Sequence, residues 1–146
     1  VWCYYLYKSS IYSSIYFSDE IWYNIYDRFR LITGRELMLF IGIEDFYEKV
    51  GEIERIRRDE EKELASKMRN GDGEAREKLI RAYLPFVAAH IRRAPESIRT
   101  LNTVYECIAS LEKAIDAFNF LQDNEPFTHR LAWCMRQSIT KCIANS

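Results

Sequence analysis

Residues 127–146 read FTHRLAWCMRQSITKCIANS and combine an apolar stripe with a cationic surface. Apolar side chains recur here at spacings of three and four, which is typical of an amphipathic helix with one buried face. The stripe consists of Leu131, Met135, Ile139, Cys142 and Ile143. The stretch contains Arg130, Arg136 and Lys141 but no acidic residue, whereas the whole chain has a net charge of -1. Any attraction to a polyanion must therefore come from a local patch such as this one.

The polar side of this predicted helix groups side chains that suit contact with nucleic acid. A guanidinium, an amide, a hydroxyl and an ammonium share one face, at Arg136, Gln137, Thr140 and Lys141. Arginine and glutamine can bind base edges through paired hydrogen bonds, while lysine and threonine can hold phosphate. Trp133 lies on an adjoining face, where an exposed indole could stack on an unpaired base. Alternatively, Trp133 belongs to the core and the cations are only solvated.

The rest of the chain after residue 38 shows the same helical periodicity. A chain of 146 residues, with 48% hydrophobic and 29% charged residues, suits one soluble domain with a real core. No convincing strand pattern and no internal repeat appears in this part. Apolar stripes at helical spacing occupy residues 46–56, 64–68, 79–91 and 101–118. The sequence therefore predicts an all-α protein, a compact bundle of about four to six helices with short loops.

Turn and cap signals separate the predicted helices. Residues 70–73, Asn-Gly-Asp-Gly, predict a helix end at a glycine and Asp72 as the N-cap of the next helix. Asp59 and Thr128 are further candidate N-caps. Pro85 is expected to kink or restart the helix in which it lies.

Residues 1–37 differ from the rest in composition, because they hold most of the chain's ten tyrosines. They have neither a strict strand period nor a strict helix period, and charged residues interrupt any apolar run of transmembrane length. We expect an aromatic interfacial helix, an added strand or hairpin, or sequence upstream of a natural start at Met38. The domain proper is then residues 38–146.

Catalytic and metal-binding motifs are absent from the sequence. There is no nucleophile elbow, no zinc-protease motif and no phosphate-binding glycine loop, so we expect no enzyme, no cofactor and no small-molecule substrate. The four cysteines form no Cys-x-x-Cys pair and only two histidines are present, which argues against a zinc site. No secretory signal pattern is visible, so we expect free thiols in a cytoplasmic protein without a membrane partner.

The order of residues from about Glu61 to Asn145 resembles region two of bacterial sigma factors of the primary, housekeeping type, with the short helix that precedes it. The stretch from residue 60 to 93, EEKELASKMRNGDGEAREKLIRAYLPFVAAHIRR, is similar to the family's helix that ends at Gly-Asp and the helix that follows. The last stretch is the most specific match to the family's Phe-Ser-Thr-Tyr-Ala-Thr-Trp-Trp-Ile-Arg-Gln-Ala-Ile-Thr-Arg. Its matching residues are Phe127, Trp133, Arg136, Gln137, Ile139 and Thr140.

The resemblance implies a bacterial transcription initiation factor with two partners, RNA polymerase core and promoter DNA. The core's clamp coiled coil would contact the helix that carries Asn102, Tyr105 and Glu106. The last helix would bind the minus-ten element, and its aromatic residues would trap flipped bases. The implied DNA-binding residues are Phe127, Arg130, Trp133, Arg136, Gln137, Thr140 and Lys141.

Two aromatic positions of the family pattern differ in this chain. Arg130 stands where the family has a base-stacking tyrosine, and Cys134 stands where it has a second tryptophan. The comparison therefore implies promoter recognition with weakened strand melting. The family also continues beyond Ser146 into further promoter-reading domains, so we expect a truncated, split or decaying factor that initiates poorly alone. The alternative is a degenerate sigma-like helical interaction domain, a decoy or regulator that does not melt promoters.

Overall fold

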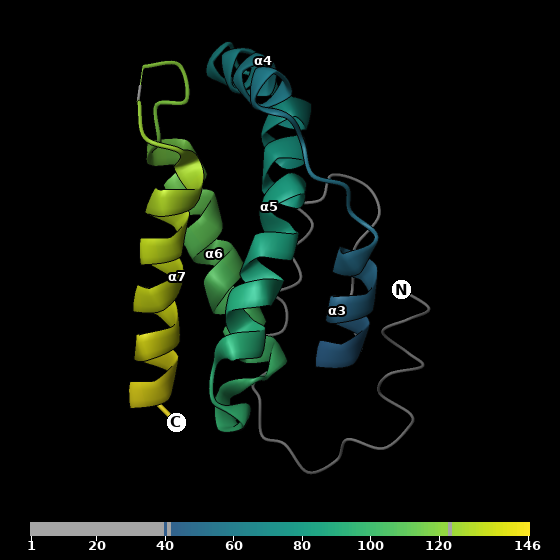
Figure 1. The fold of residues 1–146 in the computed structure, drawn as a ribbon, viewed down its shortest axis with the longest axis vertical. Coiled ribbons are helices and arrows are strands. Elements are labelled where there is room, and N and C mark those ends of the chain that lie inside the picture. Colours follow the sequence, from purple (N-terminus) through teal and green to yellow (C-terminus); the bar gives the residue numbers. More distant parts are fainter. Residues whose placement is uncertain (1–39, 41, 123) are drawn as a thin grey trace.

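The computed structural model describes residue 40 and residues 42–122 and 124–146, and this part of the chain is helical with no strand. It contains five α-helices and one short 3-10 helix (Figure 1). In chain order they are α3 (Ile43–Gly51), α4 (Arg58–Arg69), α5 (Gly73–Arg93), η1 (Glu96–Ile98), α6 (Leu101–Ala117) and α7 (Phe127–Ala144). The all-α prediction is confirmed. The expectations for residues 1–37 lie outside the described residues.

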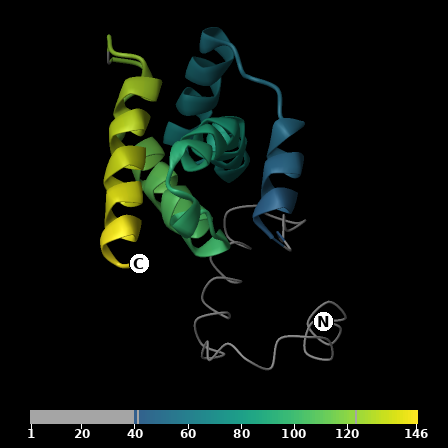
Figure 2. The ribbon, with the colours of Figure 1, turned by 60° about the horizontal axis from the view of Figure 1, so that its bottom comes forward.

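Helix α5 is the centre of the bundle. It packs against α3, α4, α6 and α7, and α6 packs in turn against α7. In both ribbon views α5 lies between α3 on one side and the α6–α7 pair on the other (Figures 1 and 2). The buried apolar residues form one continuous core that extends from Phe40 to Met135. Helix α7 is therefore an outer helix, with one face on the core and one face towards solvent.

A cluster of aromatic rings fixes the start of α7. The Phe127 ring centroid lies 4.8 Å from that of Tyr83, 5.1 Å from Phe118 and 4.9 Å from Phe120. These distances are within the range in which aromatic pairs attract one another. The Tyr83 hydroxyl donates a hydrogen bond to Glu61 Oε2 at 2.7 Å, which ties α5 to α4 beneath the same cluster. The loop between α6 and α7 is thus anchored by its own phenylalanines.

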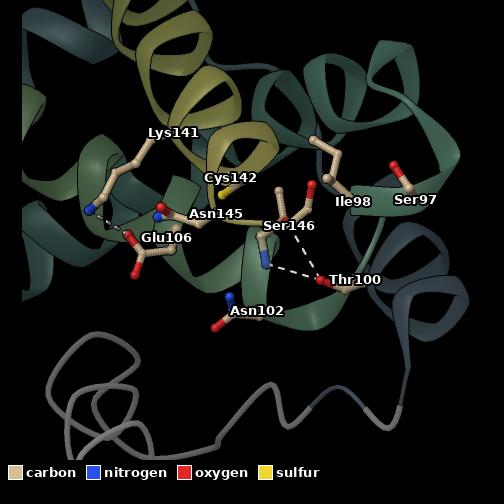
Figure 3. A pocket seen from close by; sticks show the side chains of 10 residues that line it. Ser97, Ile98, Thr100, Asn102, Glu106, Lys141, Cys142, Asn145 and Ser146 are labelled. Carbon is tan, nitrogen blue, oxygen red and sulfur yellow. Dashed lines mark hydrogen bonds and ion pairs between the residues drawn. The ribbon is translucent and has the colours of Figure 1, made fainter.

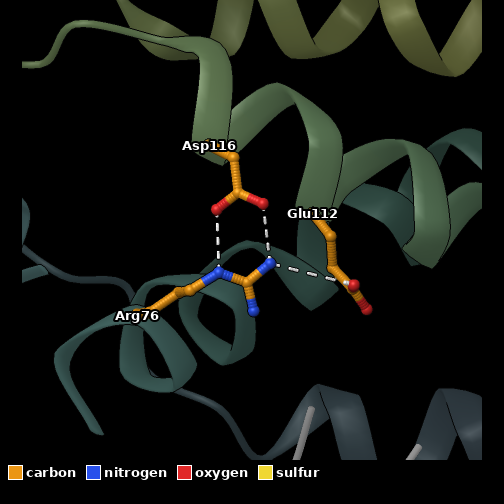
Figure 4. Close-up of polar contacts among 3 residues, drawn as sticks. All are labelled: Arg76, Glu112 and Asp116. Carbon is orange, nitrogen blue, oxygen red and sulfur yellow. Dashed lines mark hydrogen bonds and ion pairs between the residues drawn. The ribbon is translucent and has the colours of Figure 1, made fainter. Parts of the chain in front are cut away.

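An ion pair joins α5 to α6 on the surface (Figure 4). The Arg76 guanidinium donates two hydrogen bonds to the Asp116 carboxylate, at 2.7 and 2.8 Å. Its Nη2 atom also lies 3.9 Å from Glu112 Oε2. Paired hydrogen bonds of this kind fix geometry better than a single contact does. They help to hold α6 in register against the central helix.

The predicted turn at residues 70–73 is confirmed in detail. Gly71 has a φ of 93°, a left-handed conformation that favours glycine. The Asp72 carboxylate accepts hydrogen bonds from the backbone N–H of Glu74 at 2.9 Å and of Ala75 at 3.2 Å. Two backbone donors at the start of α5 are therefore satisfied by the predicted cap.

Other boundary predictions were wrong. Helix α4 begins at Arg58 and α7 at Phe127, so Asp59 and Thr128 lie inside their helices and do not cap them. Pro85 does not restart the helix, because α5 is continuous through it, and the kink that the sequence offered as the alternative stays a prediction. Its neighbours Leu84 and Val87 are buried, and this packing holds both halves of α5 on the same core.

The apolar stripe near the start of the domain continues beyond the end of its helix. Helix α3 ends at Gly51, although the apolar spacing continues to Ile56. Glycine is a poor helix former, and here it marks the C-terminal end of the helix. Ile53 and Ile56 still pack against the core from the connecting segment. The pattern thus predicted burial correctly and helix length incorrectly.

Candidate nucleic-acid interface

The inner face of α7 is fixed by residues spaced four apart. Phe127, Leu131 and Met135 are buried, at 2%, 0% and 0% exposed. Further along the helix, the Ser138 hydroxyl is hydrogen-bonded to the Ser110 hydroxyl of α6. These contacts leave no freedom for α7 to rotate about its axis. The opposite face must therefore point to solvent.

The outer face of α7 carries most of the predicted DNA-binding residues. Trp133 is 55% exposed, which is unusual for so large an apolar side chain. Successive residues of a helix are about 100° apart, so the exposed polar residues lie within one continuous arc on either side of Trp133. They are Arg130, Arg136, Gln137, Thr140 and Lys141. The alternative interpretation of Trp133 as a core residue is wrong.

Phe127 requires a correction. The sequence grouped it with the DNA-binding residues, but its side chain is almost fully buried in the aromatic cluster. A ring enclosed by Tyr83, Phe118 and Phe120 cannot stack on a base without unfolding the start of α7. Phe127 is a packing residue that positions the interface.

The residues predicted to bind polymerase share the outward side of α6. Asn102 and Glu106 are exposed and lie one turn apart, while Tyr105 is half-buried and packs against the core. The spacing of three and four places all three side chains on neighbouring positions of one helix face. The three side chains therefore lie together on α6, and their contact with polymerase stays a prediction.

The two predicted surfaces meet at an ion pair that the sequence did not indicate. Lys141 Nζ of α7 lies 3.8 Å from Glu106 Oε2 of α6 (Figure 3). Both residues line an open groove of about 320 Å³ between η1, the start of α6 and the end of α7. The two residues are far apart in sequence, and their opposite charge was the only feature of the sequence that could have indicated this contact. Helix packing alone brings them together.

Cys107 offers no reactive centre in the bundle. Burial raises the pKa of the Cys107 thiol to about 12, so it stays protonated at neutral pH. Cys134 and Cys142 are free and half-buried on the inner side of α7. Among the residues that the structure places, no group of three or more histidine, cysteine or acidic side chains could hold a metal ion. Within the same part of the chain, no helix is both long and apolar enough to cross a membrane.

Comparison with known proteins gives curated relatives that are named RNA polymerase sigma factor SigA. The chain is 31% identical over 110 residues to RNA polymerase sigma factor SigA of Clostridium acetobutylicum. The aligned stretch covers 72% of this chain and 29% of that protein. It is 30% identical over 101 residues to SigA of a Bacillus species, covering 68% and 26%. The same identity and length hold for SigA of Listeria monocytogenes, covering 68% and 27%. No protein-family model matches the chain. The chain spans less than a third of the length of these relatives.

Proposed function

We propose that this chain is a cytoplasmic transcription initiation domain. It carries a segment like that of the bacterial RNA polymerase sigma factor family. Its partners are RNA polymerase core and the minus-ten promoter element, and it has no catalytic chemistry of its own. The observation that carries the proposal is the exposed arc of α7, where Trp133 stands among cationic and amide side chains. This combination offers stacking, base-edge hydrogen bonds and phosphate contacts on one rigid helix.

Five exposed side chains of α7 divide into three roles in this proposal. Arg136 and Gln137 bind base edges in the upstream part of the element, because both can form paired hydrogen bonds with a base. Thr140 and Lys141 hold the phosphate backbone. Trp133 stacks on a base that has left the duplex, an interaction worth about 1–3 kcal/mol.

The polymerase surface is the outward side of α6. Asn102 and Glu106 offer an amide and a carboxylate, and the half-buried Tyr105 offers an apolar edge between them. A coiled coil of the polymerase clamp would lie along this helix and pair a cation with Glu106. The Arg76–Asp116 ion pair keeps α6 in place for such contact.

Recognition is better supported than strand melting. Arg130 is exposed, at the position of a base-stacking tyrosine, and its guanidinium adds positive charge. Cys134 is half-buried, at the position of a second tryptophan. Of the described residues of α7, Trp133 is the one exposed aromatic side chain. We therefore expect sequence-selective binding with poor opening of duplex DNA.

The test has two steps. The purified chain is first mixed with RNA polymerase core, and co-elution is measured by gel filtration. The complex is then titrated into a fluorescent single-stranded oligonucleotide with a TATAAT-like sequence and into a scrambled one. The proposal requires co-elution and a preference for the TATAAT-like strand. Absence of core association would refute it, and core association without oligonucleotide binding would indicate an interaction domain instead.

A further inference from the structure

We propose that the Lys141–Glu106 ion pair couples the two binding surfaces, so that polymerase and DNA each favour binding of the other. This inference rests on the proposed function, since it concerns residues assigned to both partners. Lys141 Nζ lies 3.8 Å from Glu106 Oε2, and the two side chains are 69% and 49% exposed. In the free chain, Lys141, which we propose binds phosphate, therefore lies beside Glu106, which we propose binds polymerase.

The contact makes Glu106 a competitor of DNA. Lys141 extends from the last turn of α7, at the end of the outer face that carries Trp133 and Gln137. A phosphate that approaches this end meets the carboxylate of Glu106 as well as the ammonium of Lys141. Binding of the phosphate to Lys141 must break the ion pair. Because both side chains are largely exposed, we expect the competition to be modest, about two- to fivefold in affinity.

A polymerase cation that pairs with Glu106 removes this competition. The carboxylate then has a new partner, and Lys141 becomes available to phosphate. By thermodynamic linkage, DNA bound to Lys141 must raise the affinity of Glu106 for polymerase by the same factor. Both residues line the same groove (Figure 3), so no movement of a helix is needed to transmit the effect.

The competition is tested by a double-mutant cycle in the free chain. The variants are Glu106→Gln, Lys141→Met and the double variant, and the readout is the affinity for a fluorescent TATAAT-like oligonucleotide. We expect E106Q to raise the affinity about two- to fivefold in the wild-type background and to have no effect in the Lys141→Met background. An equal gain in both backgrounds would overturn the proposal, because it would show general repulsion by Glu106.

Glu48→Gln is the matched control for the loss of one negative charge. Glu48 is exposed on α3, which packs on α5. We expect this variant to bind the oligonucleotide as the wild-type chain does. A gain equal to that of E106Q would also overturn the proposal. Thermal unfolding of every variant verifies that the exposed substitutions leave the fold intact.

The coupling itself is tested with RNA polymerase core. Core affinity is measured for wild type and Lys141→Met, each with and without a saturating concentration of the oligonucleotide. We expect the oligonucleotide to raise core affinity about two- to fivefold more for wild type than for K141M. Equal enhancement in the two proteins would refute the coupling and leave the proposed function standing. A wild-type chain that binds neither partner would instead refute the proposed function.

Discussion

Two aromatic residues of α7, Phe127 and Trp133, have opposite surroundings. They lie six residues apart, and six residues turn a helix by about 240°, so one ring points into the core and the other into solvent. The sequence offered both as candidate DNA-binding residues. Only the burial of each side chain separates a ring that holds the fold from a ring that can bind a base.

Phe127→Ala is expected to destabilise the protein by about 3–5 kcal/mol, as large core truncations do. The substitution empties a site that is enclosed by Tyr83, Phe118 and Phe120. Urea unfolding followed by circular dichroism measures the loss. A change below about 1 kcal/mol would show that the aromatic cluster does not anchor α7.

Trp133→Ala is expected to act mainly on binding. Because the indole is 55% exposed, the free energy of unfolding should fall by much less than for Phe127→Ala. Affinity for a TATAAT-like single strand should fall by about 1–3 kcal/mol, the value of one stacked base. Fluorescence anisotropy with the core-bound chain gives the second quantity. Unchanged affinity would remove Trp133 from the interface.

Gln137→Ala and Lys141→Ala should impair DNA binding in different ways. Loss of the Gln137 amide should relax the preference for one base, because a side chain that binds base edges is removed. Loss of the Lys141 ammonium should weaken binding to all sequences alike and lower the salt dependence by up to about one counterion. Titrations of matched and scrambled strands at several salt concentrations separate the two. Equal, sequence-independent losses in both variants would show that Gln137 reads no base.

At the scale of single elements, the accuracy of the sequence-based predictions depended on local chemistry. The turn at residues 70–73 was predicted correctly because both signals are local: Gly71 adopts a left-handed backbone conformation, and the Asp72 carboxylate accepts from the backbone N–H of Glu74, two residues later. The restart predicted as one alternative at Pro85 was wrong, because α5 is continuous there and Leu84 and Val87 on either side of it are buried in the core. The N-caps of α4 and α7 are Arg57 and Pro126, each two residues before the predicted cap, so local signals located these helix starts only approximately.

Asp72→Ala is expected to reduce stability by about 0.5–2 kcal/mol through loss of the α5 cap. The carboxylate now accepts from two backbone N–H groups, at 2.9 and 3.2 Å. Asp72→Asn is the matched variant, since its side-chain oxygen can still accept and should recover most of the loss. Chemical denaturation of the three proteins measures the difference. Equal loss in both variants would argue that charge, and not capping, is responsible.

At the scale of the whole molecule, several buried acids predict lower stability in alkaline solution. Burial raises the pKa of the Tyr83 hydroxyl and of the Cys107 thiol, the latter to about 12, and burial also raises the pKa of Tyr47. An acid whose pKa is raised in the folded state stabilises the protein fully below its unfolded pKa. That contribution is lost as the pH rises towards the folded value.

The free energy of unfolding should therefore begin to fall at about pH 8.5, which is the pKa of an unfolded cysteine. It should fall faster above about pH 10, which is the pKa of an unfolded tyrosine. Cys107 contributes a slope of about 1.4 kcal/mol per pH unit between its unfolded pKa and its folded pKa of about 12. Urea unfolding between pH 7 and 11 measures this loss. Cys107→Ala should delay the onset to about pH 10. A stability that stays constant to pH 11 would contradict the burial of these groups.

The sequence predicted the fold class well, and it predicted which side chains of α7 are exposed except for Phe127. Helical periodicity was enough for an all-α bundle, because a single buried face recurs in every helix. The outer face of α7 was also predictable, since its residues lie on one element. The Lys141–Glu106 contact was not, because it depends on how α6 packs against α7. Contacts between elements are the part that required the structure.

The central claim is that the outer face of α7 reads a promoter sequence when the chain is bound to polymerase. The most direct test is the ratio of affinities of the core-bound chain for a TATAAT-like strand and a scrambled strand, by fluorescence anisotropy at one fixed salt concentration. Base-edge contacts are worth about 1–3 kcal/mol each, so the predicted ratio is at least about tenfold in favour of the TATAAT-like strand. Equal affinity for the two strands would contradict the account.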